Sequence, residues 1–119
     1  MRLRLTVAVA VLVALVGAGN AYAASTTFVI SQFQVAGGTA ADEFVELHNV
    51  SGATQNLRGH VLAYRSATGT TDVTLVSWAN DTFVPAGAFY LVAASPGYDG
   101  SATADTTFAH SGTLSLIHI

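Results

Sequence analysis

Beyond residue 26, the sequence is divided into short runs of β-forming residues by clusters of Gly, Asn, Asp and Ser about every ten residues. The runs are rich in Val, Phe, Tyr, Leu and Thr, and none sustains the 3.6-residue period of an amphipathic helix. Even spacing of short strands is typical of an antiparallel sandwich or barrel. We expect strands at Phe28–Val35, Phe44–Asn49, Gly59–Ser66, Val73–Trp78 and Ala88–Ala94, and a weaker one at Thr106–His110.

Two segments indicate how the strands are placed. Alternation along 44–49 puts Val45 and Leu47 on the core face of a strand, and Phe44, Glu46 and His48 on the other face. At 83–92, Pro85 restricts φ and Gly87 can adopt a left-handed conformation, which predicts a hairpin with a bulged three-residue loop.

The first 23 residues have the pattern of a secretory signal peptide. Two arginines precede an apolar run of 12 residues from Leu5 to Val16, which as a helix would be about 18 Å long and too short for a hydrocarbon core of about 30 Å. Small residues at Ala21 and Ala23 predict cleavage before Ala24, so that residues 24–26 form a short linker. We therefore expect a secreted, extracellular or cell-envelope protein without a membrane span after cleavage.

Composition excludes several classes of function. The chain has no cysteine, so disulfides, thiolate catalysis and cysteine-ligated zinc are excluded. Beyond residue 23, two arginines face seven carboxylates, a net charge of −5 that argues against direct binding of nucleic acid. The absence of lysine in an alanine-rich chain is typical of a GC-rich bacterial genome.

Four ordered segments, 28–33, 42–49, 57–62 and 83–92, are similar to those of the lamin tail domain family. The resemblance covers residues 27–112 and implies an immunoglobulin-like antiparallel β-sandwich of the secreted bacterial type, regarded as a non-catalytic binding module. Two positions depart from the family pattern: His60 replaces a common aromatic residue, and Gln32 replaces a common Glu. The resemblance implies structural roles for the motif positions Ile30, Glu43, Phe44, Val45, Glu46, Leu47, Asn49, Leu57, Gly59, Leu62, Pro85, Gly87 and Leu91.

The family pattern continues past residue 119 into one or two closing strands. We therefore expect residues 113–119 to be a truncated end, and 115–119 resemble translated sequencing-adapter DNA; the alternative is a genuine short terminal strand. An unpaired sheet edge would favour oligomerisation or strand donation from another chain.

The residues that could take part in catalysis or metal binding are better explained by structural roles. Asp42, Glu43 and Glu46 have no partner histidine, and we expect the first two to be solvated at a strand entrance. The four histidines lack metal-ligand spacing, and His60 shares a strand face with core residues. We expect no metal, no cofactor and no catalytic residue. The alternatives considered are calcium at Asp99, Gly100 and Asp105, N-glycosylation at Asn49 or Asn80, and an aromatic platform of Tyr64, Trp78, Tyr90 and Tyr98.

These observations favour a secreted, non-catalytic module that binds or adheres through loops and sheet edges to a protein or cell-envelope ligand. One alternative is the N-terminal accessory module of a longer secreted nuclease or phosphohydrolase. Another is a self-associating envelope protein.

Overall fold

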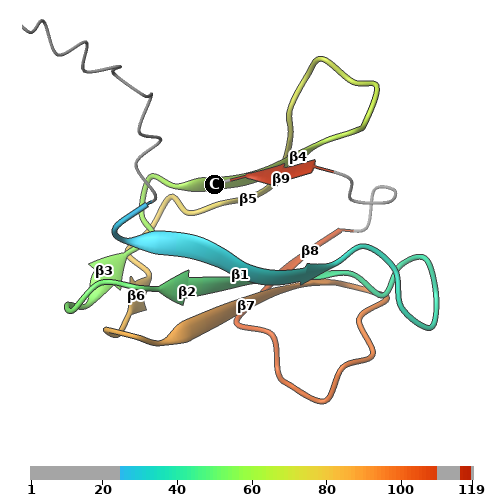
Figure 1. The fold of residues 1–119 in the computed structure, drawn as a ribbon. Coiled ribbons are helices and arrows are strands. Elements are labelled where there is room, and N and C mark those ends of the chain that lie inside the picture. The colour runs from blue at the N-terminus through green and yellow to red at the C-terminus, as the bar shows by residue number, and fades with distance from the viewer. Residues whose placement is uncertain (1–24, 110–115, 119) are drawn as a thin grey trace, which may run out of the picture.

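The computed structural model describes residues 25–109 and 116–118, and these residues form strands and turns only. Two sheets face each other in a sandwich (Figure 1). One sheet has the order β1-β2-β7-β8, the other has the order β5-β4-β9, and β3 and β6 form a small separate ladder. The strands are β1 (Phe28–Gln34), β2 (Phe44–Asn49), β3 (Gln55–Asn56), β4 (Val61–Arg65), β5 (Val73–Ser77), β6 (Phe83–Val84), β7 (Phe89–Ala94), β8 (Thr106–Phe108) and β9 (Leu116–His118).

The six strands expected from the sequence are all present, with small differences at their ends. The strand expected from Gly59 begins at Val61, because residues 57–60 form a turn in which the amide of His60 donates to the carbonyl of Leu57 (2.9 Å). The predicted signal peptide, residue 24 of the linker and most of the predicted C-terminal end lie outside the described residues. Within that end, residues 116–118 form β9, which pairs with Ala63–Arg65 of β4.

The predicted alternation of β2 is confirmed. Val45 and Leu47 are fully buried, and their neighbours Phe44, Glu46 and His48 are half-buried on the other face. Facing sheets shield the side chains between them from water, so one face of each central strand is apolar. The core comprises Phe28, Val45, Leu47, Leu57, Leu62, Tyr64, Trp78, Val84, Val92, Ala94 and Phe108.

The hairpin predicted at Pro85–Gly87 is wrong, although the turn itself is present. The amide of Ala88 donates to the carbonyl of Pro85 (3.1 Å), and Gly87 has a φ of 70°, as a left-handed turn position requires. The flanking strands do not pair with each other, because β7 lies between β2 and β8 while β6 pairs with β3. The turn therefore carries the chain from the small ladder into the larger sheet.

The edges of both sheets are interrupted or short. On β1, Ser31 is an extra residue between the pairs Ile30–Leu47 and Gln32–Glu46, and on β5, Leu75 is bypassed in the same way. The opposite edges, β8 and β9, have only three residues each, and β8 runs parallel to β7 whereas the other pairs are antiparallel. Bulges and short strands limit the addition of a further strand to an edge.

Residues 25–109 and 116–118 contain no helix with the length and apolarity needed to cross a membrane.

Candidate functional site

Asn49, at the end of β2, is a fully buried polar residue whose side chain joins three segments. Its amide nitrogen donates to the carbonyl oxygens of Ala53 (2.8 Å), Val84 (2.9 Å) and Pro85 (3.0 Å). Its oxygen accepts from the amide (3.0 Å) and hydroxyl (2.7 Å) of Ser51. The burial and bonding of Asn49 indicate a structural role and leave its amide nitrogen inaccessible as a glycan acceptor in the folded protein.

The expectation that Asp42 and Glu43 are solvated is wrong. Asp42 is only 4% exposed and Glu43 is fully buried. Glu43 precedes β2 and has the same parity as Val45 and Leu47, so the alternation that buries those residues extends one position further. No buried polar side-chain atom among the described residues lacks a hydrogen-bond partner, so both carboxylates are accommodated by bonds within the fold.

The remaining motif positions are divided between the core and the turns. Leu57 and Leu62 are fully buried, and Ile30 packs against the core from β1. Gly59 has a φ of 84°, a left-handed conformation within the turn before β4. Leu91 is half-buried on β7, where its amide and carbonyl are both bonded to Asp105.

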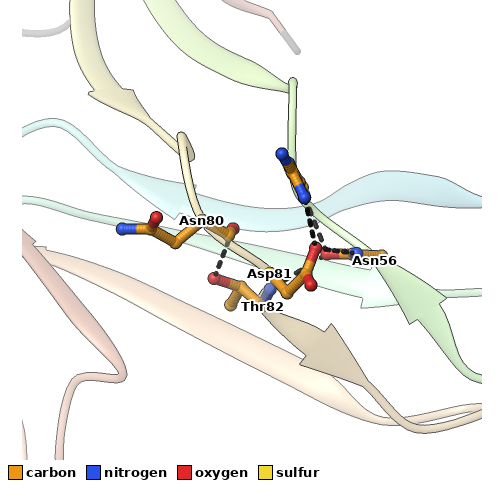
Figure 2. Close-up of polar contacts among 5 residues, drawn as sticks. Asn56, Asn80, Asp81 and Thr82 are labelled. Carbon is orange, nitrogen blue, oxygen red and sulfur yellow. Dashed lines mark hydrogen bonds and ion pairs between the residues drawn. The ribbon is translucent and has the colours of Figure 1, made fainter.

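A second polar cluster surrounds Asn56 at the β3–β6 end (Figure 2). The oxygen of Asn56 accepts from the amides of Arg58 (3.0 Å) and Thr82 (2.9 Å), and its nitrogen donates to Asp81 (2.9 Å). Asp81 also pairs with Arg58 (3.3 Å). Asn80 is exposed, and Figure 2 shows its side-chain amide pointing away from Asn56 and Asp81.

The solvent-facing side of the larger sheet carries a row of side chains across three strands. Strand pairing aligns Val29 of β1 with His48 of β2, and His48 with Phe89 of β7. The rings of His48 and Phe89 are stacked, with centroids 4.2 Å apart and an angle of 16° between their planes. Phe89 is the first residue of β7, beyond the Val92–Ala94 stretch that pairs with β8, and it is 56% exposed. We call Val29, His48 and Phe89 the outer-face row.

Two loops meet at the other end of the sandwich, away from the β3–β6 ladder. The carboxylate of Asp42, in the 35–43 loop, accepts from the amide of Gly38 (3.2 Å) and from the amide of Asp99 in the 95–105 loop (3.2 Å). Tyr98 packs edge-on against Phe44, with ring centroids 5.9 Å apart. A Cβ atom at Gly97 would collide with the carbonyl of Ala41, so the two backbones are in direct contact.

The two carboxyl groups in these loops have opposite pKa shifts. Burial alone would raise the pKa of Asp42, but hydrogen bonds from Asp99 and Gly38 outweigh it and the pKa is lowered. The hydrogen bond that Asp99 shares with Asp42, then the charge of Asp42 and burial, raise the pKa of Asp99.

The histidine, aromatic and calcium-site candidates from the sequence lie in the core or are separated from one another. The His60 ring packs edge-on against the core residue Phe28 at 5.6 Å, as expected for a histidine at the core edge. Trp78 and Tyr64 are buried core residues, so they do not belong to an exposed aromatic platform. Asp105 bonds to the backbone of Leu91, whereas Asp99 contacts Asp42, so the two are held by different groups. Across residues 25–109 and 116–118, no three His, Asp or Glu side chains are grouped as metal ligands.

Sequence reasoning missed the contact between Asp42 and Asp99, which are 57 positions apart in the chain. The stacking of His48 on Phe89 was also missed, because it depends on β2 and β7 being neighbours. The sequence did carry a signal for the stacking of His48 on Phe89, because both residues lie at outward-facing positions of predicted strands.

Comparison with known proteins agrees with the fold. Among curated proteins, no match to this sequence was found. The model of one protein family, Lamin Tail Domain, matches residues 21–117. This match covers most of the chain and agrees with the all-β sandwich, which is the immunoglobulin-like fold of that family. The chain therefore belongs to the lamin tail domain family.

Proposed function

We propose that this chain is a secreted, non-catalytic binding module that attaches to a protein or glycan component of the bacterial cell envelope through the outer-face row. The observation that carries the proposal is the exposure of Phe89 at the start of β7, where its ring is stacked on His48 and His48 is in turn paired with Val29. An aromatic ring held rigidly by a neighbour offers contact area with little loss of conformational entropy on binding.

The polar groups support a binding role over a catalytic one. Asp42 accepts two backbone hydrogen bonds, and Glu46 accepts the hydroxyl of Ser31 (2.6 Å). Asn49 and Asn56 each hold separate chain segments together. These side chains have structural partners, and a catalytic base must be able to exchange its partner for a substrate.

Binding of the secreted protein to cell-envelope fragments of the encoding organism tests the proposal. We expect the wild type to sediment with the fragments and Phe89→Ser to lose most of this binding. Phe83→Ser is the matched control, since Phe83 is 64% exposed but lies in the β3–β6 ladder, outside the outer-face row. Equal binding by wild type and Phe89→Ser, or phosphoester hydrolysis abolished by Glu46→Gln, would contradict the proposal.

Secretion is tested separately at the N-terminus. We expect the protein recovered from the culture medium to begin at Ala24, because Ala21 and Ala23 present small side chains to a signal peptidase. Mass spectrometry of secreted material that retained Met1 would refute this prediction.

A further inference from the structure

We propose that the ligand of the outer-face row is a neutral glycan, with the ring of Phe89 as its stacking surface and the carboxylate of Asp105 as an acceptor for its hydroxyl groups. The inference rests on the proposed function, because it names the chemical class of ligand for the same surface and adds Asp105 to that surface.

The Phe89 ring is covered by an aromatic neighbour on one side only. Towards β2 the ring is stacked on His48, with an angle of 16° between the planes. On the opposite side of β7, β8 pairs only with Val92–Ala94, so the strand does not extend to Phe89, which is 56% exposed. The face of an aromatic ring is electron-rich and attracts the weakly positive C–H groups that line one face of a sugar. Phe89 therefore offers a rigid ring on which a sugar can stack.

Asp105 places a carboxylate on the same edge of β7. Its Oδ2 accepts from the amide of Leu91 (2.8 Å), and its own amide donates to the carbonyl of Leu91 (2.8 Å). Phe89 and Leu91 are two positions apart, so they share a face and an edge of the strand and lie about 7 Å apart. Within residues 25–109 and 116–118, Oδ1 of Asp105 has no hydrogen-bond partner, and the residue is exposed. The backbone of β7 thus fixes an acceptor near the ring.

The charges near the outer-face row select against an anionic ligand. The strands of the larger sheet contain no Lys or Arg. Both arginines of the described residues lie outside that sheet, and each is paired with an aspartate. The nearest carboxylates are Asp105 and Glu46, which lies two positions before His48 on the outward face of β2. Because phosphate and carboxylate groups bind best to Arg, Lys and N–H donors, this surface favours a neutral ligand rich in hydroxyl donors.

A single exposed ring fits a sugar better than a protein. Among the described residues on the outer face of the larger sheet, Phe89 is the one large apolar side chain that is more than half exposed. Phe33 is 55% exposed, but it is aligned with the buried Val45 and so belongs to the inward face. A stable protein interface buries about 800 Å² on each partner around a well-packed apolar centre. One ring beside a carboxylate matches instead the C–H face and the hydroxyl rim of a sugar.

Binding of the secreted protein to cell-envelope fragments that have been digested exhaustively with protease tests the glycan assignment. The competitors are oligosaccharides released from the same fragments by partial acid hydrolysis and separated by ion exchange into a neutral and an anionic fraction. We expect wild-type binding to be unchanged by the digestion. We also expect the neutral fraction to compete for binding and the anionic fraction not to compete.

Phe89→Leu tests the stacking role, because leucine keeps an apolar side chain and lacks the ring. We expect it to lose about tenfold in affinity for the digested fragments, whereas Phe89→Trp keeps a ring and should bind at least as well as the wild type. Phe83→Leu is the matched control, since it removes an equally exposed ring in the β3–β6 ladder and should leave binding unchanged.

Asp105→Asn tests the acceptor role. Its remaining oxygen can still accept from the amide of Leu91, while an N–H₂ donor replaces the free carboxylate oxygen, so we expect affinity to fall severalfold without a change in melting temperature. Asp81→Asn removes the same charge at the β3–β6 end of the sandwich and should bind like the wild type (Figure 1).

The outcomes separate this assignment from the proposed function. Binding that is lost on protease digestion, or that only the anionic fraction competes for, would overturn the neutral glycan and leave the envelope-binding role intact. Wild-type affinity in Phe89→Leu would refute the stacking role, and wild-type affinity in Asp105→Asn would refute the acceptor role. Absence of wild-type binding to undigested fragments would contradict both the glycan assignment and the proposed function.

Discussion

At the scale of single residues, buried polar groups and turn geometry specify this fold as much as apolar packing does. The fully buried side chain of Asn49 donates hydrogen bonds to three carbonyl oxygens and accepts two hydrogen bonds from Ser51. Apolar residues of the same size could fill the space, but they would leave those carbonyls without donors.

Asn49→Ala should lower the free energy of unfolding by about 2–4 kcal/mol, because it leaves buried carbonyls without their donor and creates a cavity. Urea titration followed by tryptophan fluorescence measures this. Asn80→Ala is the matched control at an exposed asparagine, where we expect a change of less than about 0.5 kcal/mol. Equal losses in the two variants would show that the Asn49 bonds contribute nothing specific.

Gly87→Val should lower the free energy of unfolding by about 1–3 kcal/mol, because a β-branched residue is strained at a φ of 70°. Gly52→Val is the comparison, since a Cβ at Gly52 meets no atom within 4 Å and its φ lies outside the left-handed region. Thermal denaturation of both variants checks the difference. Melting at the wild-type temperature for Gly87→Val would rule out the left-handed turn.

At the scale of elements, the shortest strands depend on side-chain bonds more than on their own ladders. The β3–β6 ladder has only the pairs Gln55–Val84 and Asn56–Phe83. The Asn56 side chain strengthens it by bonding to the amide of Thr82 and the carboxylate of Asp81 (Figure 2).

Asn56→Ala should therefore cost about 1–2 kcal/mol and preferentially expose the amides of Leu57 and Thr82 to hydrogen exchange. Arg58→Gln is the control, because it removes only an ion pair between two largely exposed side chains, worth about 0–1 kcal/mol. A larger loss in Arg58→Gln than in Asn56→Ala would show that the ion pair, and not the amide, holds the ladder.

The longer strands could be predicted from the sequence because β-forming residues, alternation and turn residues are local signals. The same signals could not predict β3 and β6, because two residues have no measurable period and their pairing depends on Asn56 contacting Thr82, 26 positions away. The supposed hairpin at Pro85 failed for a related reason: the local turn was correct, but the sheet order that separates β6 from β7 is a long-range property. The burial of Glu43 was predictable from parity, since it continues the series of Val45 and Leu47.

At the scale of the whole molecule, the sandwich depends on β4, the central strand of the smaller sheet. It contributes Leu62 and Tyr64 to the core and lies between β5 and β9. Figure 1 shows β9 beside β4 and facing the larger sheet. Loss of β9 would leave one side of β4 open to other chains.

A chain shortened to end at residue 112 should therefore self-associate and melt at a lower temperature than the full chain. Sedimentation velocity over a range of concentrations measures the association, with the full chain under the same conditions as reference. Monomeric behaviour and unchanged melting in the shortened chain would show that β9 adds no stability, as expected if residues 115–119 were foreign to the protein.

The bonds of Asn49 also have a consequence for the order of folding. Its amide reaches carbonyls 35 and 36 residues further along the chain, so an early pairing of β1 with β2 alone leaves this group with its local partners Ser51 and Ala53 but without the two distant carbonyls. The loss of hydration at Asn49 is compensated in full only when the 84–85 segment is in place, after a long loop has closed. Folding should therefore be slow and all-or-none, with the closing of this distant contact as part of the rate-limiting step.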